Sequence, residues 1–294
     1  MDRAAFACLL AGGCAIAFAP IFVRLSDTGP LASAFWRVAL AVPLLWLWVA
    51  WMARRAALSS PRPPQSRRRA GARLPLVLAG LFFALDLGVW HWSIVWTSVA
   101  NATLLANLAP IVVTLAGWLV WKRKVSRTFL VGMVVAIAGM FVLVGPNFAI
   151  GGTRLLGDAL GALTAVFYAA YMLAIKQARD AHASTASLMA WSTTITAAAL
   201  LPVALIAPQP FLPAAAGGWL VLAGLAIVSQ VLGQGLIAYA FAHLPASLSS
   251  VSLLIQPVVA ALAAWAIFGE AVGPAQWIGG AIVLAGIWIA KRAS

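Results

Sequence analysis

The sequence predicts an all-α integral membrane protein of ten transmembrane helices, built as two inverted five-helix repeats. Three features predict this fold class: the composition, ten long apolar runs and an internal repeat. The chain has 294 residues, of which 64% are hydrophobic and 9% charged, whereas a soluble domain carries roughly 25% charged residues. Lipid must therefore be its main solvent. The apolar runs are continuous, which favours helices over a β-barrel with its alternating pattern.

Ten apolar runs are each long enough to cross a hydrocarbon core of about 30 Å as a helix. Turn-forming residues separate them, including Gly-Pro-Asn at 145–147 and three prolines at 208, 210 and 213. The first run loosely imitates a signal peptide, but Asp2 and the nine further runs favour a first transmembrane helix. The expected spans are 4–23, 30–52, 74–95, 98–121, 127–146, 155–177, 184–207, 217–242, 245–268 and 273–291.

Lys and Arg residues are divided unevenly between the two ends of these spans. If the N-terminus is cytoplasmic, sixteen of the nineteen lie at cytoplasmic ends, and the exceptions are Arg24, Arg37 and Arg154. Cytoplasmic loops of membrane proteins carry such an excess of basic residues. The distribution therefore predicts that both termini are cytoplasmic, and it explains the net charge of +13 without nucleic-acid binding.

The two halves of the chain repeat each other, which divides it into units 1–147 and 148–294. Each unit holds five spans, and an odd number of spans inverts one unit relative to the other. Secondary transporters are often built from inverted repeats, with the substrate site near the membrane midplane between them. The matches are residues 109–118 with 256–265, Gly132 with Gly279 and Gly139 with Gly286 at a shift of 147, and residues 78–81 with 222–225 at a shift of 144.

The start of the fourth helix carries a recognisable motif. Residues 96–105 read W-T-S-V-A-N-A-T-L-L and run into Leu-Ala-Pro at 108–110. This stretch resembles the T-S-x-A-x-A-x-L-L…P pattern of EamA-type exporters in the drug/metabolite transporter superfamily. Phe-Gly-Glu at 268–270 is similar to the family's Gly-Glu signature after the ninth helix, whereas the first half has Trp-Lys-Arg-Lys at 121–124. The resemblance covers nearly the whole chain.

The resemblance implies both an architecture and a function. The family's fold would place helices 1, 3, 4, 6, 8 and 9 around a central cavity. Family members export amino acids, including aromatic ones, and other metabolites or drugs. It thus implies a secondary exporter of small metabolites, with amino acids as the expected cargo, working by alternating access in a bacterial inner (plasma) membrane. Two alternatives stay open: other cargo, such as a drug or a nucleotide- or lipid-linked metabolite, and a membrane-embedded enzyme.

The third helix offers the strongest candidate site residues. Asp86, Trp90, Ser93 and Thr97 recur at helical spacing and share one face, and an ionisable residue inside a membrane usually faces a cavity or a partner. A carboxylate there could hold a substrate ammonium or a proton, and an indole could stack on a ring or a cation. The alternative is that Asp86 lies nearer the inner end, hydrated or paired. His91 lies about 140° around the helix, where packing is the alternative to proton transfer.

The repeat and two further helices supply the other candidates. The shift of 144 pairs Asp86 with Gln230 and Trp90 with Gln234. Thr103, Asn107 and Thr114 share a face of the fourth helix; Ser249, Ser252 and Gln256 share one on the ninth, where packing is the alternative use of the serines. Tyr168, Tyr171, Trp36 and Arg37 are weaker candidates. The expected substrate-binding set is Asp86, Trp90, His91, Ser93, Asn101, Asn107, Tyr168, Gln230, Gln234 and Gln256, with Pro110 and Pro257 as kinks.

No enzyme motif is found in the sequence. It has no Walker A loop, no G-x-S-x-G elbow and no H-E-x-x-H, so we expect neither ATP drive nor catalytic residues. Cys8 and Cys14 share the first helix, and three histidines form no cluster with them, so no metal and no cofactor are expected. The expected partners are a small-molecule substrate and the lipid bilayer, with a monomer as the assumed state.

Overall fold

The computed structural model describes residues 2–59, 73–97, 99–122, 124–145 and 155–293. Every regular element in these ranges is a helix. Nine helical segments in them are long and apolar enough to cross a membrane. A further helix of 19 residues, α16 (Pro274–Arg292), lies beside α9 (Arg127–Val144) as a tenth span. The predicted all-α membrane fold is confirmed.

The first half forms its spans from one or two helices each. The first span is α1 (Arg3–Ile16) with α2 (Ala19–Leu25), the second α3 (Pro30–Ala39) with α4 (Ala41–Ser59), the third α6 (Arg73–Trp96), the fourth α7 (Val99–Ala106) with α8 (Ala109–Trp121), and the fifth α9.

The second half likewise forms five spans, each from one or more helices. Its spans are α10 (Leu155–Asp180); α11 (Thr185–Ile206); α12 (Ala216–Gly224) with the π-helix η3 (Leu225–Gln234) and α13 (Gly235–Ala240); α14 (Ala246–Ser252) with α15 (Ile255–Phe268); and α16.

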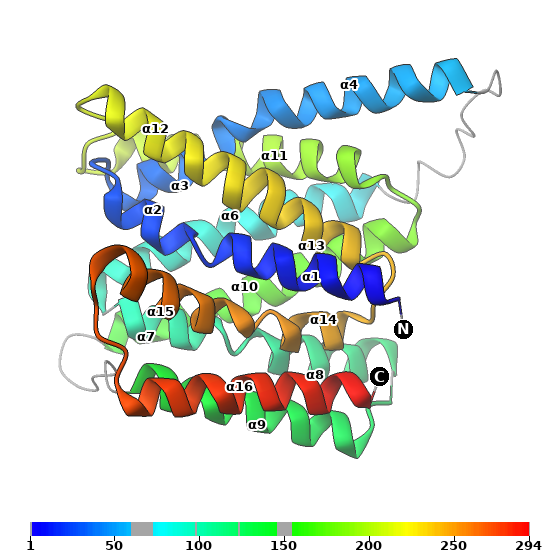
Figure 1. The fold of residues 1–294 in the computed structure, drawn as a ribbon. Coiled ribbons are helices and arrows are strands. Elements are labelled where there is room, and N and C mark those ends of the chain that lie inside the picture. Colours follow the sequence, from blue (N-terminus) through cyan, green and yellow to red (C-terminus); the bar gives the residue numbers. More distant parts are fainter. Residues whose placement is uncertain (1, 60–72, 98, 123, 146–154, 294) are drawn as a thin grey trace.

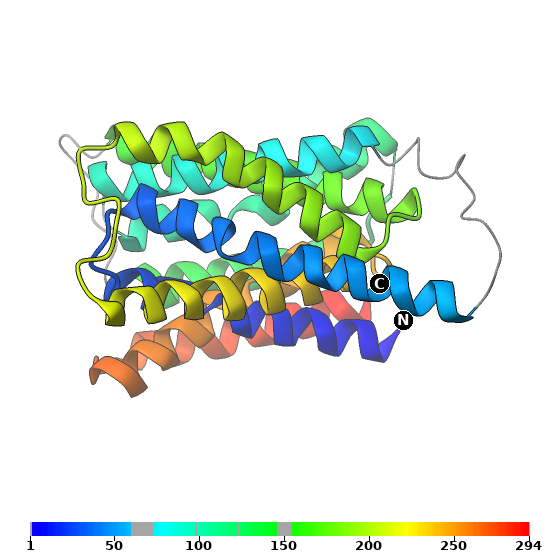
Figure 2. The same cartoon turned by 90° about the horizontal axis from the view of Figure 1, so that it is seen from above.

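The two halves are inverted across the bundle. Both termini lie at the same end in two perpendicular views (Figures 1 and 2). The first half begins at this end, which we call the terminal end, and after five spans it finishes at the opposite end, where α10 begins. This arrangement confirms the inverted repeat that the sequence predicts.

Several spans are interrupted just before a proline, and at two of these prolines, Pro110 and Pro257, the sequence predicts a kink. The breaks fall at residues 17–18, 107–108 and 253–254, shortly before Pro20, Pro110 and Pro257. Proline has no N–H to donate to the carbonyl four residues earlier, and its ring clashes with that carbonyl. The second span is broken in the same way at Leu40, three residues before Pro43. The eighth contains the π-helix η3, which the apolar pattern does not predict.

The four glycines that repeat at the shift of 147 all lie between α9 and α16, which pack along each other. A Cβ on Gly139 would lie 2.5 Å from the backbone nitrogen of Val283 and 2.9 Å from the carbonyl oxygen of Gly279. Small residues let membrane helices approach this closely. The repeated glycines therefore join the fifth span of one half to the fifth span of the other, away from the central cavity.

Candidate functional site

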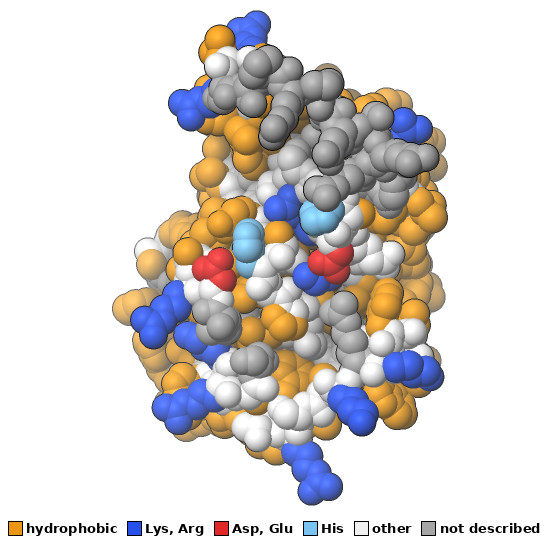
Figure 3. Space-filling view, turned by 90° about the vertical axis from the view of Figure 1, so that its right-hand side faces the viewer, with side chains coloured by type: hydrophobic (Ala, Val, Ile, Leu, Met, Phe, Trp, Pro, Cys, Tyr) orange, Lys and Arg blue, Asp and Glu red, His pale blue; other side chains and the backbone are white. Residues whose placement is uncertain are grey.

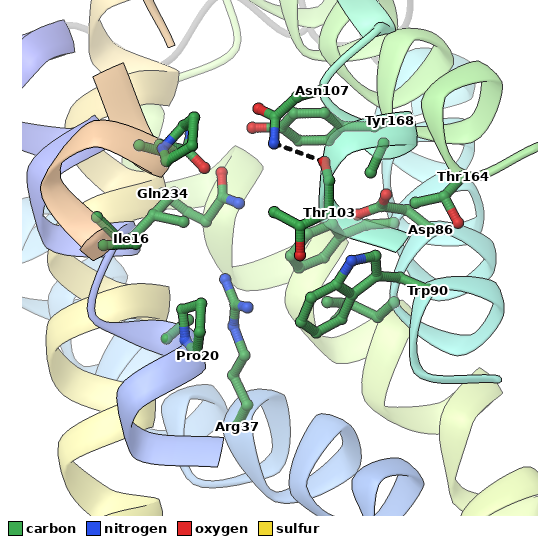
Figure 4. Close-up of a pocket in the computed structure, with 18 residues that line it drawn as sticks. Ile16, Pro20, Arg37, Asp86, Trp90, Thr103, Asn107, Thr164, Tyr168 and Gln234 are labelled. Carbon is green, nitrogen blue, oxygen red and sulfur yellow. Dashed lines mark hydrogen bonds between the residues drawn. The ribbon is translucent and has the colours of Figure 1, made fainter. Parts of the chain in front are cut away.

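A central cavity of about 130 Å³ lies where the two halves meet (Figure 4). Its wall draws on the first, third, fourth, sixth, eighth and ninth spans, as the family resemblance implies, and also on α3 of the second. The residues used below are Ile16, Pro20, Arg37, Phe83, Asp86, Trp90, Thr103, Asn107, Thr164, Tyr168, Gln234, Gln256 and Pro257.

The breaks in the first, fourth and ninth spans all border this cavity. Ile16 and Pro20 flank the first break, Asn107 lies in the second, and Gln256 follows the third. The Asn107 side chain donates to the carbonyl of Thr103 at 2.8 Å. Broken helices leave backbone groups without their usual helical partners, and transporters use such groups at substrate sites. The proline positions therefore place polar backbone at the cavity wall.

Arg37 brings a cation into this wall from α3. Its side chain is buried, and its Nε donates to Oε1 of Gln230 at 3.2 Å. Gln230 in turn donates through Nε2 to the hydroxyl of Thr193 at 3.1 Å. The guanidinium lies 5.7 Å from the centroid of the Phe83 ring and points toward Gln234 in Figure 4. A basic side chain of the first half is thus oriented by a glutamine of the second.

Asp86 faces the same cavity from α6 and is 8% exposed. Among the described residues, the ion pairs closer than 4 Å are Arg24–Glu270 and Lys176–Asp180, so Asp86 and Arg37 do not form one. Ionisable groups inside a membrane are costly and usually mark a substrate or ion pathway. The two side chains therefore present opposite charges to one small cavity from separate helices.

Aromatic rings form much of the remaining wall. Phe83 and Tyr171 stack with centroids 4.5 Å apart, and Tyr171 stacks on Tyr168 at 6.2 Å. The Tyr171 hydroxyl donates to Oε1 of Gln234 at 3.2 Å. Trp90 completes the apolar surface on the side of Asp86 (Figure 4). The wall thus combines a few polar groups with a surface suited to an apolar or aromatic side chain.

Two fully buried polar atoms of the lining residues have no hydrogen-bond partner within the described part of the chain. They are the hydroxyl of Thr103 and Nε2 of Gln256, both buried. Leaving a buried polar group unsatisfied costs about 1–3 kcal/mol. These atoms therefore mark positions where a polar group of a bound molecule would gain a hydrogen bond.

The structure brings together six of the ten predicted site residues, together with Pro257. The six are Asp86, Trp90, Asn107, Tyr168, Gln234 and Gln256. Gln230 lies behind the wall, where it holds Arg37. Pro110 follows the break in the fourth span but does not line the cavity.

The remaining three predicted residues lie elsewhere. His91 is buried outside the cavity wall, with Nδ1 2.6 Å from the carbonyl oxygen of Leu87. Ser93 donates to the carbonyl of Gly157 at 2.7 Å and so joins α6 to α10. The Asn101 side chain is outside the described part of the structure.

Sequence reasoning ranked Arg37 too low and passed over Phe83 and Thr164. The signal for Arg37 was present, because it is the one exception to the charge distribution that lies well inside a span. A mid-span arginine needs a specific partner. Of the other two weak candidates, Trp36 lies outside the cavity, since its Nε1 donates to the carbonyl of Phe211 at 2.8 Å, and Tyr171 supports the wall from behind.

Ten spans in two inverted halves, with a cavity between them, match the architecture of membrane transporters. The pattern of the EamA-like transporter family matches residues 3–145 and 155–291, and the chain belongs to this family. This confirms the resemblance identified from the sequence. The family is one of transporters and not of enzymes.

Several proteins that are named as transporters or exporters are similar to the chain. An "uncharacterized transporter" of Archaeoglobus fulgidus is 29% identical over 67% of this chain and 68% of its own length. The pseudopaline exporter of Pseudomonas aeruginosa is 26% identical over 74% and 76%. A protein of Streptantibioticus cattleyicolor named "probable terminal-alkyne amino-acid exporter" is 29% identical over 80% of each chain. A crystal structure with 17% identity superimposes with a TM-score of 0.79 over 99% of this chain and 98% of that one, which supports the fold.

Proposed function

We propose that the protein exports small amino acids across a bacterial inner membrane by alternating access between its two halves. The amino acid binds in the central cavity with its carboxylate at Arg37 and its ammonium at Asp86. Trp90 and Tyr168 contact its side chain, which favours apolar and aromatic amino acids. Thr103 and Gln256 supply further hydrogen bonds.

The single observation that carries this proposal is the pair of opposite charges facing one cavity without forming an ion pair. A zwitterion matches both groups at once, whereas a cargo with one charge leaves the other group unpaired at a cost of several kcal/mol. The volume of about 130 Å³ supports a small cargo, because pockets for drug-sized ligands measure roughly 300–1,000 Å³. One of the relatives carries the name of an amino-acid exporter.

The proposal includes an orientation and a domain division. Lys and Arg side chains are spread around the rim of the terminal end, which is otherwise largely hydrophobic (Figure 3). We therefore assign this end, with both termini, to the cytoplasm. The family's match to residues 3–145 and 155–291 supports two repeat units, 1–147 and 148–294. The first unit contributes both charged residues of the cavity, Arg37 and Asp86, and the second contributes Gln230, which supports Arg37.

The test uses the purified protein in proteoliposomes loaded with each of the twenty labelled amino acids in turn. At least one amino acid should leave these vesicles faster than it leaves equally loaded vesicles without the protein. Asp86→Asn and Arg37→Gln should each reduce that flux at least tenfold, since each removes a charge-assisted hydrogen bond to the cargo. Asp2→Asn and Arg292→Gln neutralise charges outside the cavity and should leave it unchanged.

Two results would overturn the assignment. If no amino acid is transported but a nucleotide-linked or lipid-linked metabolite is, the protein is a transporter of other cargo. Equal flux in Asp86→Asn, Arg37→Gln and their matched controls would remove the central cavity as the binding site even if amino acids are transported.

A further inference from the structure

A second cavity, of about 170 Å³, lies toward the terminal end between α8, α10 and the start of α14. We call it the inner cavity. Its polar lining comprises Thr114, Lys124, Lys176, Gln177, Asp180 and Ser247. None of these residues lines the central cavity. The two cavities are similar in volume, so the inner one can hold a molecule of the same size.

One lining residue of the inner cavity is related by the internal repeat to a lining residue of the central cavity. Val113 of α8 lines the inner cavity, and Ala260 of α15 lines the central one. They are 147 residues apart, which is the shift that relates the two halves. In an inverted repeat, equivalent positions lie on opposite sides of the midplane. The part of the inner cavity that Val113 lines is thus the counterpart, on the terminal side, of the part of the central cavity that Ala260 lines.

The same three spans carry both cavities along one line. The fourth, sixth and ninth spans contribute residues to each. Between the cavities these spans contact one another through buried side chains, including Pro110 on α8 and Met172 on α10. Ser252, the last residue of α14, is also buried, and its hydroxyl has no hydrogen-bond partner among the residues that the structure describes. On α10, Tyr168 of the central cavity and Leu173 of the inner cavity are five residues apart, which is about 8 Å of helix.

The positions of Lys176 and Asp180 at the inner cavity are not those that would best stabilise α10. Asp180 is the last residue of α10, where the helix dipole disfavours a carboxylate. It pairs with Lys176 at 2.8 Å, with the lysine four residues earlier, and this order stabilises a helix less than the reverse. The Lys176 side chain is only 15% exposed. The pair thus holds a partly buried ammonium at the cavity wall against local preference.

The charge balance identifies the ligand class. Lys176 and Lys124 bring two ammonium groups to the inner cavity, and Asp180 brings one carboxylate, which leaves one positive charge in excess. We propose that the inner cavity is a second binding site, at which the carboxylate of a small amino acid is held by Lys176 and Lys124 before it reaches the central cavity. This proposal rests on the proposed function, because it takes the cargo class from it.

The test measures protection of single cysteines in purified protein held in lipid nanodiscs. Cys8→Ser and Cys14→Ser remove the two native thiols. Ser247→Cys then reports on the inner cavity, and Ala260→Cys, in a separate protein, reports on the central one. The modification rate by uncharged N-ethylmaleimide is followed by mass spectrometry with and without each of the twenty amino acids at millimolar concentration.

We expect a transported amino acid to slow modification at both cysteines. Lys176→Gln should raise by roughly tenfold the amino-acid concentration that gives half-maximal protection of Ser247→Cys. A change of this size corresponds to the loss of one charge-assisted hydrogen bond. Lys291→Gln, which neutralises a lysine at the same end but outside the inner cavity, should leave it unchanged. Asp86→Asn should abolish protection of Ala260→Cys while protection of Ser247→Cys persists.

The outcomes separate this proposal from the proposed function. Protection at Ala260→Cys alone, or equal effects of Lys176→Gln and Lys291→Gln, overturns the inner site and leaves amino-acid transport standing. Protection at neither cysteine by any amino acid overturns both. If Ser247→Cys does not fold, Gly117→Cys replaces it, because Gly117 lines the same inner cavity.

Discussion

The ion pair between Arg24 and Glu270 joins the two halves at the end opposite the termini. Arg24 lies at the end of α2 and Glu270 just beyond α15, and Arg24 also lies over the Phe268 ring at 4.4 Å. Both helices line the central cavity nearer the midplane, at Pro20 and Ala260. At a rise of 1.5 Å per residue, Arg24 lies about 6 Å beyond Pro20. We therefore expect the pair to favour closure of the cavity on this side.

We consider the substitution Glu270→Gln, which removes the ion pair. The size of its effect follows from how exposed the two paired side chains are. The two side chains are 56% and 49% exposed, so the pair is worth about 0.2–1 kcal/mol and is screened by salt. Loss of the pair should raise the population open on this side by up to about fivefold. The modification rate of Ala260→Cys by N-ethylmaleimide should rise by the same factor at low salt and by less at 1 M salt.

A charge swap provides the decisive control. Arg24→Glu combined with Glu270→Arg restores an ion pair and should return the modification rate to that of the parent. The Asp2→Asn variant changes a carboxylate at the other end and should have no effect. A Glu270→Gln rate equal to the parent's at low salt would refute the reasoning, as would a swap variant no slower than either single change.

Three further predictions concern contacts other than the Arg24–Glu270 ion pair. Gly139→Ala should lower the unfolding temperature, because its Cβ meets the α16 backbone at 2.5 Å and overpacking costs about 1–3 kcal/mol; Gly117→Ala, which meets nothing within 4 Å, should not lower it. Tyr171→Phe removes the hydroxyl that donates to Gln234 and should weaken amino-acid transport two- to tenfold, about 0.5–1.5 kcal/mol, in a flux assay at unchanged protein level. Ser93→Ala breaks a bond between α6 and α10, so its thermal stability should fall while the transport KM stays the same.

The fold followed almost entirely from the sequence. The ten apolar runs lie within a few residues of the observed spans except at the second, where α4 continues to Ser59. These runs are predictable because lipid acts on each helix separately, through its length and composition. The inversion was equally predictable, since it depends only on counting five spans in each repeat.

The broken spans show what the length and composition of each apolar run do not predict. Prolines predict the interruptions near positions 110 and 257, but no residue pattern predicts the π-helix η3. A π-helix changes which side chains share a face, so periodicity of 3.6 residues cannot place Gln230 and Gln234 by itself.

The sequence alone determined the membrane fold, the repeat, the family and the identity of most polar residues within the spans. Tertiary structure decided which of them meet. Asp86 and His91 are five residues apart on one helix, yet Asp86 faces the central cavity and His91 lies outside its wall. Arg37 and Gln230 are 193 residues apart and form a hydrogen bond. The physical reason is that lipid fixes whether a segment spans the membrane, whereas its rotation about its own axis is fixed only by the helices packed against it.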